Sequence, residues 1–436
     1  MRIAIIGAGI AGVTAAHALA AAGHRVTVYE RRGSVAAEAS FAPLGLLAPS
    51  LASPGVLSPF AALTAGRWWR LPHEAHIRAG WRPANWHWLW QTRQQLARRG
   101  TLQQALRELA AYGQQQHARL VAEQRLEFES CQGHIVLLPE GTRLKAAQQA
   151  CEALRVQGVA ARWLSADECR ALEPGLEPDA PLAAAIHFPQ DEAVNGRQIV
   201  HLLKEEGERL GVEFRFATEV TRIEPGRTPR LHSNPSGSAT SRVSRHASTL
   251  ASLPPMEPQE DEHDAVLLCV GGRSDALLRA LHLPLPLMPV HGYTVTANLR
   301  HIERTPRAAI TDAAQGVSLM RLGQRVRIGG GLEIGTPVGD HHEAMLDRLY
   351  AVLDRWFPGA AHKMHAQTWK GTCLQLPDGL PLIGPSPVEG VWLNLGHANQ
   401  GWATSCAAAT LLAQSLSGRN PDLPLERYGL ARLQRG

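Results

Sequence analysis

Three glycines near the start of the sequence have the spacing of a nucleotide-binding turn, G-x-G-x-x-G. In this pattern the first glycine permits a tight turn, the second lets the backbone approach a pyrophosphate, and the third lets a helix pack closely on a strand. A helix that begins at such a turn also offers free N–H groups and a positive dipole end to the anion. We therefore expect the turn to bind the diphosphate of a dinucleotide. Its residues are Gly7, Ala8, Gly9, Ile10, Ala11 and Gly12.

The elements on both sides of this turn have the order that such a site requires. Residues 2–6 are expected to form a short buried strand, residues 11–22 a helix, and residues 25–29 a second strand. Glu30 follows the second strand, where a carboxylate can accept hydrogen bonds from an adenosine ribose. The neighbouring Arg31 could favour a 2′-phosphate, but a carboxylate at residue 30 opposes it. FAD and NAD share this pattern, so the rest of the chain must decide between them.

Five stretches together resemble the D-amino acid oxidase superfamily, most closely the D-amino acid dehydrogenase small subunit family. The likeness covers nearly the whole length, except mainly residues 225–263 and a tryptophan-rich region. The stretches are the opening Ile-Ile-Gly-Ala-Gly-Ile-Ala-Gly; Ser40-Phe41-Ala42 with Gly45 and Pro49; Pro289-Val290-His291-Gly292-Tyr293; Arg325-Val326-Arg327-Ile328-Gly329-Gly330; and the tail, Pro377-Asp378-Gly379 to Gly384, Gly396-His397 and Gly401-Trp402.

The resemblance implies FAD as the cofactor, stretched between the first glycine turn and the glycine-rich tail. A reduced flavin gathers negative charge at its N1–C2=O edge, which backbone N–H groups of a glycine-rich turn would stabilise. By the resemblance, Ser40 and Gly45 would lie along the pyrophosphate and ribityl chain, and Val220 would meet the adenine. The further residues expected around the cofactor are Leu46, Gly271, Gly396, His397, Asn399, Gly401 and Trp402.

The sequence departs from the family at one position of the substrate site. The segment before Pro-Asp-Gly usually presents an arginine that binds the substrate carboxylate through two parallel hydrogen bonds, and this chain has Cys373 there. Another cation could replace it, with Arg321 and His291 as candidates, or the substrate could lack a carboxylate. A covalent bond between Cys373 and FAD is a third alternative. Tyr293 could hydrogen-bond the substrate or fill the core, and His397 is expected beside the flavin.

The activity implied by the resemblance is oxidation of the C–N bond of a small amine or D-amino acid. A hydride would pass from the substrate carbon to flavin N5, and the imine would hydrolyse to an oxo acid and ammonia. Such a site needs alignment over the flavin and exclusion of water. The alternatives are an oxidase of a secondary amine or of an amine without a carboxylate, as in glycine or sarcosine oxidases and a tRNA-modifying relative, and a flavin-binding protein that has lost turnover.

The fold class expected is α/β plus α+β, with a Rossmann-type FAD-binding domain and a discontinuous antiparallel-sheet substrate domain. We assign residues 1–65, 190–282 and 366–436 to the FAD-binding domain, and 66–189 and 283–365 to the substrate domain. Residues 225–263 are rich in Pro, Ser and charged residues, and they predict a disordered insertion within the FAD-binding domain. Further strands are expected at 133–138, 183–188, 292–297, 317–321 and 326–330.

Composition limits the kinds of partner and the cellular location that we expect for this protein. The net charge is +5, but lysine and arginine are scattered, so no nucleic-acid partner is expected. The six cysteines form no CxxC pair, which predicts reduced thiols and no metal site. Glycines interrupt the apolar run of residues 1–22, so it is not expected to be a signal peptide. We expect a cytoplasmic protein without a membrane span. The tryptophans between residues 68 and 90 leave open a peripheral contact with the inner face of the membrane. The electron acceptor is expected to be a quinone or oxygen.

Overall fold

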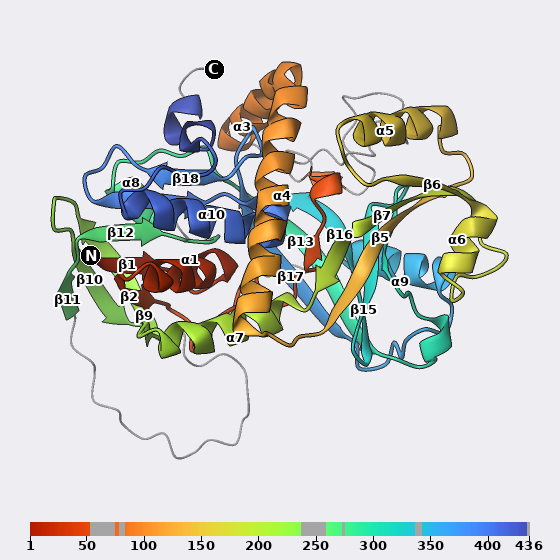
Figure 1. Ribbon diagram of the computed structural model, residues 1–436, viewed down its shortest axis with the longest axis horizontal. Helices are drawn as coiled ribbons and strands as arrows, with labels where there is room; N and C mark the ends of the chain where they lie inside the picture. The colour runs from red at the N-terminus through yellow and green to blue at the C-terminus, as the bar shows by residue number, and fades with distance from the viewer. Residues whose placement is uncertain (53–74, 78–82, 237–258, 273–274, 336–341, 434–436) are drawn as a thin grey trace, which may run out of the picture.

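The computed structural model describes residues 1–52, 75–77, 83–236, 259–272, 275–335 and 342–433. Within them, two large sheets lie side by side, and the long helix α4 (Arg99–Gln124) runs along their boundary (Figure 1). Helix α3 (Pro83–Gln94) precedes α4. Both sheets draw strands from widely separated parts of the chain, so residues distant in sequence meet where the sheets adjoin.

The smaller sheet has the strand order β18-β19-β12-β1-β2-β8, and every pair except β18 with β19 is parallel. The predicted strands 2–6 and 25–29 are confirmed, with Ile3 of β1 opposite both Val26 and Ala265. The carboxyl ends of parallel strands share one edge, which is where ligands bind in sheets of this kind. The strands are β1 (Arg2–Ile6), β2 (Arg25–Tyr29), β8 (Glu213–Arg215), β12 (Ala265–Leu268), β18 (Leu382–Pro385) and β19 (Val391–Leu395).

Helices pack against this sheet through a continuous apolar core. Helix α1 (Ile10–Ala21) contacts both α10 (Gly401–Leu416) and α7 (Gly196–Arg209). The short helix α8 (Asp275–Ala280) adds Leu277 and Leu278 to a second cluster. Helix α4 crosses α10 closely because Gly113 has no side chain: a Cβ there would lie 2.0 Å from the Ala403 carbonyl oxygen. Helix α1, near the start of the chain, and α10, near its end, thus pack together in this core.

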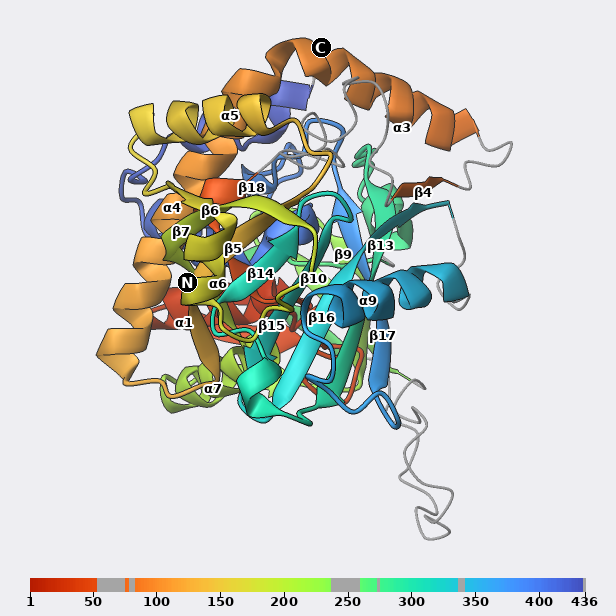
Figure 2. The same ribbon diagram turned by 90° about the vertical axis from the view of Figure 1, so that its right-hand side faces the viewer.

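The larger sheet has the order β17-β13-β16-β15-β14-β5-β7-β3, with β4 added to β16 and β6 to β7. The five further strands predicted from the sequence all lie within it. Helix α9 (Glu343–Trp356) covers one face of it (Figure 2), while α5 (Leu144–Val156) and α6 (Ala166–Leu172) lie near β6. The strands are β3 (Leu46–Leu47), β4 (Ala75–Ile77), β5 (Ser130–Pro139), β6 (Arg162–Ser165), β7 (Leu182–Val194), β13 (Met288–Asn298), β14 (Ala309–Asp312), β15 (Val317–Leu322), β16 (Arg325–Ile334) and β17 (Gln367–Gln375).

Two parts of the segment 225–263, expected from its composition to be a disordered insertion, form strands. Strands β10 (Arg230–Pro235) and β11 (Gln259–Glu262) pair with each other, and β10 pairs with β9 (Thr218–Glu224). Cross-strand ion pairs such as Arg230–Glu262 (2.8 Å) supply side-chain contacts to a strand with little apolar surface. Residues 237–258 lie outside the described residues. The domain limits drawn from the sequence stay a prediction, with β17, assigned there to the FAD-binding part, pairing with β13.

Candidate active site

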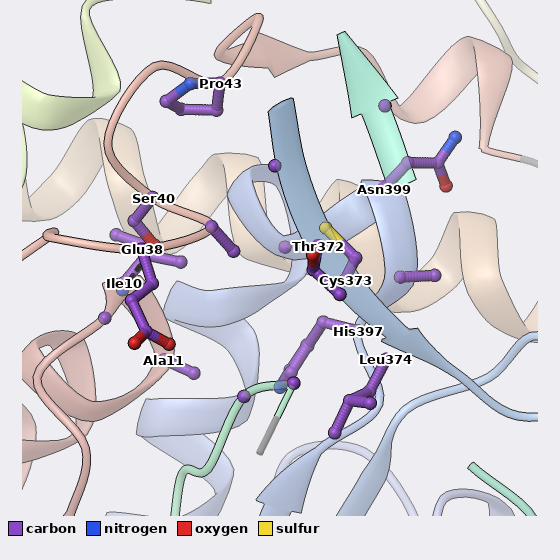
Figure 3. Close-up of a pocket in the computed structure, with 18 of the residues that line it drawn as sticks. Ile10, Ala11, Glu38, Ser40, Pro43, Thr372, Cys373, Leu374, His397 and Asn399 are labelled. Atoms are coloured by element: carbon purple, nitrogen blue, oxygen red, sulfur yellow. Dashed lines mark hydrogen bonds between the residues drawn. The ribbon is translucent and has the colours of Figure 1, made fainter. Parts of the chain in front are cut away.

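A cavity of about 550 Å³ lies at the carboxyl edge of the smaller sheet, beside the larger one. Its walls include the glycine turn after β1, residues 37–46, the start of β9, and parts of β13 and β17. The segment from Asn394 to Trp402 closes it. Figure 3 shows Ile10 and Ser40 on one side, Cys373 on β17 in the middle, and Asn399 on the other side.

The first glycine turn is closed to any larger side chain. Gly7 has φ +104°, and a Cβ there would lie 2.7 Å from the Cys269 carbonyl oxygen. A Cβ on Gly12 would lie 1.9 Å from the Gly7 carbonyl oxygen. Of the six turn residues, Gly7, Gly9, Ile10 and Ala11 line the cavity, whereas Ala8 and Gly12 lie behind it and support the turn. The turn therefore presents backbone to the cavity, as the sequence pattern predicted.

Glu30 fixes this turn from the neighbouring strand. Its carboxylate accepts hydrogen bonds from the backbone N–H groups of Ala8 and Arg32, both at 2.8 Å. Burial raises the pKa of Glu30, and the two N–H donors oppose that rise. Arg31 and Arg32 are paired with Glu38, at 2.6 and 2.8 Å. Their guanidinium groups are thus paired with a carboxylate at the wall of the cavity.

The loop after β2 and the start of β9 also line the cavity. The Ser40 hydroxyl oxygen accepts a hydrogen bond from the Ile10 N–H at 3.1 Å, at the amino end of α1. Gly45 has φ +71°, and a Cβ there would lie 2.0 Å from the Val194 carbonyl oxygen. Leu46, Val220 and Gly271 also line the cavity.

His397 holds the second glycine turn in place. Gly396 before it has φ +76°. The imidazole Nε2 donates to Asn394 Oδ1 at 2.9 Å, because Asn394 Nδ2 itself donates to the Ala11 carbonyl at 3.1 Å. The other ring nitrogen, Nδ1, lies 2.8 Å from the Thr404 hydroxyl. Burial lowers the pKa of His397 to about 4, so the ring is neutral. These contacts identify His397 as a positioning residue that ties this turn to α1.

The second turn leads directly into helix α10. Gln400 precedes the helix and gives no side-chain cap, so the first N–H groups of α10 lie free of a capping side chain beside the cavity. Trp402 packs on Gly196, where a Cβ would lie 2.2 Å from the indole ring. Asn399, Gly401 and Trp402 all line the cavity. This end of the cavity therefore offers a positive helix terminus to an anionic group.

Cys373 faces the cavity from the middle of β17. Side chains alternate along a strand, and Cys373 shares its face with Trp369, whose ring lies 4.5 Å from that of Phe41. Burial raises the pKa of the Cys373 thiol to about 11, so it is protonated near neutral pH. Among the described lining residues, Arg31 is the only arginine or lysine, and it is paired with Glu38.

The other three substrate-site candidates are placed differently. Tyr293 lines the cavity, but its hydroxyl donates to Glu333 Oε2 at 2.9 Å. His291 is 2% exposed and lies outside the lining, with Nδ1 2.8 Å from the Thr372 hydroxyl. Arg321 also lies outside the lining. Strand alternation explains this: Arg321 shares a face with Leu319, which belongs to the core under α9. The structure thus leaves Arg321 outside the cavity lining, whereas His291 lies opposite Thr372, next to Cys373 along β17, but is itself outside the lining.

The lining residues that were missed from the sequence include Thr311 on β14 and Ser318 on β15. Both are small hydroxyl residues within short apolar strands, and no motif distinguishes them there. Alternation along 317–322 could have placed Ser318 opposite the Leu319 face. The pairing of Ser318 with Thr311 across the sheet, however, can be known only from the fold.

Comparison with known proteins gives the family. Residues 2–415 match the family model described as FAD dependent oxidoreductase. The chain belongs to the FAD-dependent oxidoreductase family. A D-amino acid dehydrogenase of Cereibacter sphaeroides (strain ATCC 17029 / ATH 2.4.9) is 34% identical to it over 98% of this chain and 95% of the relative. A D-amino acid dehydrogenase of Bradyrhizobium diazoefficiens is 30% identical over 98% of this chain and 99% of the relative. This FAD-dependent oxidoreductase shares its fold with glycine oxidase from Geobacillus kaustophilus, with a TM-score of 0.73, 19% identity and 99% of each chain covered.

The residues present fit the FAD of this family. The turn can present its backbone to a pyrophosphate because Gly7 and Gly12 lack side chains, which would clash with the Cys269 and Gly7 carbonyl oxygens. Glu30 offers carboxylate oxygens one strand away, and the α1 and α10 amino ends flank the cavity. This FAD-dependent oxidoreductase therefore has both ends of a dinucleotide site in one continuous cavity.

Proposed function

We propose that this FAD-dependent oxidoreductase oxidises the C–N bond of a small D-amino acid or a related amine. The observation that carries the proposal is the single cavity that joins the two glycine turns and continues to Cys373 and Tyr293 on the larger sheet. Two D-amino acid dehydrogenases at 34% and 30% identity over nearly the whole chain support this substrate class.

Bound FAD supplies a two-electron acceptor for the hydride on the substrate carbon. The chain's own residues then have three tasks. The turn held by His397 and the amino end of α10 stabilise negative charge at one end of the cavity. Residues of β13 and β17 align the substrate and exclude water. The imine released is hydrolysed by water to an oxo acid and ammonia.

The direct test is anaerobic mixing of the FAD-loaded protein with a series of D-amino acids, their L-enantiomers, glycine, sarcosine and L-proline. Bleaching of the visible flavin absorbance by D-amino acids, with little by L-enantiomers, is the expected result. A flavin that dithionite reduces but that every amine in the series leaves oxidised would refute the proposed activity.

A second substrate class is favoured by Cys373. A neutral thiol stands where the family's carboxylate-binding arginine is expected, so an amine without a free carboxylate is the alternative substrate. D-alaninamide and simple primary amines belong in the same screen. Faster reduction by the amide than by D-alanine would favour this alternative.

For the electron acceptor, we propose a quinone rather than oxygen, by analogy with relatives named dehydrogenases. Among the described residues no helix is long and apolar enough to cross a membrane. Trp86 and Trp90 are 58% and 55% exposed on α3, and we propose that they give a peripheral membrane contact; Trp68 and Trp69 lie outside the described residues. Flotation with liposomes tests the contact, and its loss in the Trp86→Ala, Trp90→Ala double variant is expected. Oxygen uptake that outpaces quinone reduction would reject the choice of acceptor.

A further inference from the structure

A buried chain of polar side chains leads away from the cavity across the larger sheet. Ser318 and Thr311 line the cavity, and their hydroxyl oxygens lie 2.7 Å apart. The Thr311 hydroxyl in turn lies 2.7 Å from Nε2 of His134, which is fully buried on β5. Because β15, β14 and β5 are neighbours in the sheet, each strand contributes one member of the chain.

The far end of this chain is a carboxylate on the next strand. Asp191 of β7 is 3% exposed, and its Oδ2 lies 3.8 Å from Nδ1 of His134. Ser50 of the short helix Pro49–Leu51 donates a hydrogen bond to the same oxygen. His134 Nδ1 makes no hydrogen bond within the described structure, and the Asp191 carboxylate lies within ion-pair distance of it. A fully buried imidazole between a hydroxyl and a carboxylate is suited to receive a proton.

We propose that Ser318, Thr311, His134 and Asp191 form a proton relay that takes one proton from the ammonium group of the bound substrate. This inference rests on the proposed function. An amine can give up hydride only in its neutral form, yet a small amine is largely protonated near neutral pH. The relay resolves this conflict within the cavity.

The proton movement balances at every atom. Ser318 lies three strands across the sheet from β17, so the substrate N–H gives its proton to water in the cavity, which passes a proton to Ser318. The proton of Ser318 passes to Thr311, and the Thr311 proton passes to Nε2 of His134. His134 begins as the tautomer with hydrogen on Nδ1, facing Asp191, and ends as an imidazolium beside that carboxylate. The neutral amine then loses a hydride to FAD and becomes an iminium, which water hydrolyses to a carbonyl compound and ammonium.

Among the groups packed around His134, Asp191 supplies the negative charge that would balance an imidazolium. From β7, His187 lies near His134, and burial, Arg162 of β6 and His134 all lower its pKa. Glu192, also on β7, lies near Asp191, and burial and Asp191 raise its pKa. From β14 and the Pro49–Leu51 turn, the facing groups are hydroxyls. The Phe188 ring completes the enclosure at 6.4 Å between ring centroids.

The first experiment is the pH profile of anaerobic flavin reduction in the wild type and in His134→Gln, Thr311→Val and Ser318→Ala. Each variant is expected to reduce its flavin about 100-fold more slowly at neutral pH, the scale of general-base catalysis. At alkaline pH, where the amine arrives neutral, the variants should come within a few-fold of the wild type. His117→Gln is the matched control, because His117 is also buried but lies on α4 outside the cavity lining.

The second experiment measures protons rather than turnover. Binding of 2-aminoisobutyrate, which has no hydrogen on its α-carbon, is followed by NMR of protein labelled with heavy nitrogen in its histidines. The wild type should gain one histidinium signal as the ligand binds, whereas His134→Gln should gain none, because its bound ligand keeps the proton. Thermal unfolding and the flavin content of each variant identify any variant that fails to fold. If His134→Gln does not fold, the pH profiles of Thr311→Val and Ser318→Ala test the relay in its place.

Three results would overturn the relay. They are a His134→Gln profile that matches the wild type, a rate loss that is equal at neutral and alkaline pH, and a wild-type protein that gains no histidinium signal when the ligand binds. A wild-type enzyme that no amine reduces would instead refute the proposed function itself.

Discussion

Replacement of Cys373 by arginine tests what this cavity selects. The thiol faces the cavity from β17, and among the described residues no unpaired lysine or arginine lines the wall. An arginine at 373 could hold a substrate carboxylate through two parallel hydrogen bonds. We expect Cys373→Arg to improve the reduction of the flavin by D-alanine and to leave reduction by D-alaninamide nearly unchanged.

The size of this effect follows from two opposing terms. Each charge-assisted hydrogen bond contributes about 1.5–3 kcal/mol, so a bidentate pair contributes roughly 3–6 kcal/mol. Placing a guanidinium in a partly buried cavity costs several kcal/mol of desolvation. A net gain of about 1–3 kcal/mol remains, which is roughly a tenfold to hundredfold lower KM for the amino acid.

The assay is anaerobic stopped-flow reduction with D-alanine and D-alaninamide, each over a range of concentrations. Cys373→Met is the control, because it adds length at the same position without charge. Equal improvement for acid and amide, or improvement in the methionine variant as well, would show that space rather than charge decides. Failure of the arginine variant to bind D-alanine more tightly while it retains FAD would refute the placement of the carboxylate beside residue 373.

Three further predictions follow from contacts of the fold. Gly12→Ala places a Cβ 1.9 Å from the Gly7 carbonyl oxygen, so the protein should purify with little flavin by visible absorbance; normal flavin content would contradict this. Glu173 is buried and its pKa is raised to about 6, so its contribution to stability is full below its ordinary pKa and is lost as pH rises through 6. Chemical unfolding at several pH values should show Glu173→Gln gaining about 2 kcal/mol on the wild type between pH 4.5 and 8, and a pH-independent difference would reject it. Glu333→Gln removes the carboxylate partner of Lys370, 2.8 Å away, and should cost about 3–5 kcal/mol in the same assay, with much less loss in a Glu333→Leu, Lys370→Met double variant.

The cofactor half of the site could be read from the sequence because its signals are local. The turn at Gly7–Gly12 sits between a strand and a helix only a few residues away, and each glycine answers a steric need within that unit. Glu30 was placed by the length of a single strand–helix–strand unit. The prediction that the tail lies beside the flavin depended on the family resemblance, because no local motif near Gly396 and Trp402 indicates a flavin site.

The substrate half could not be read in the same way, because it depends on which strands become neighbours. The sequence offered Arg321 and His291 as cations near Cys373, but Arg321 shares a strand face with Leu319 of the core, and His291 is buried against Thr372, outside the cavity lining. Thr311 and Ser318 line the cavity because the order of the sheet places their strands, β14 and β15, beside it. Residues 225–263 show a further limit, since a segment with little apolar surface still pairs through β10 and β11.

The parallel edge of the smaller sheet has a consequence for biosynthesis. Strands β1 and β2 leave the ribosome early, whereas β19, the outer neighbour of β12, and the turn at 396–402 are translated after most of the chain. A nascent polypeptide that stops before residue 396 has one wall of the cavity and lacks the other. We therefore expect the flavin to bind only after translation is nearly complete, when the turn at 396–402 can meet the first glycine turn.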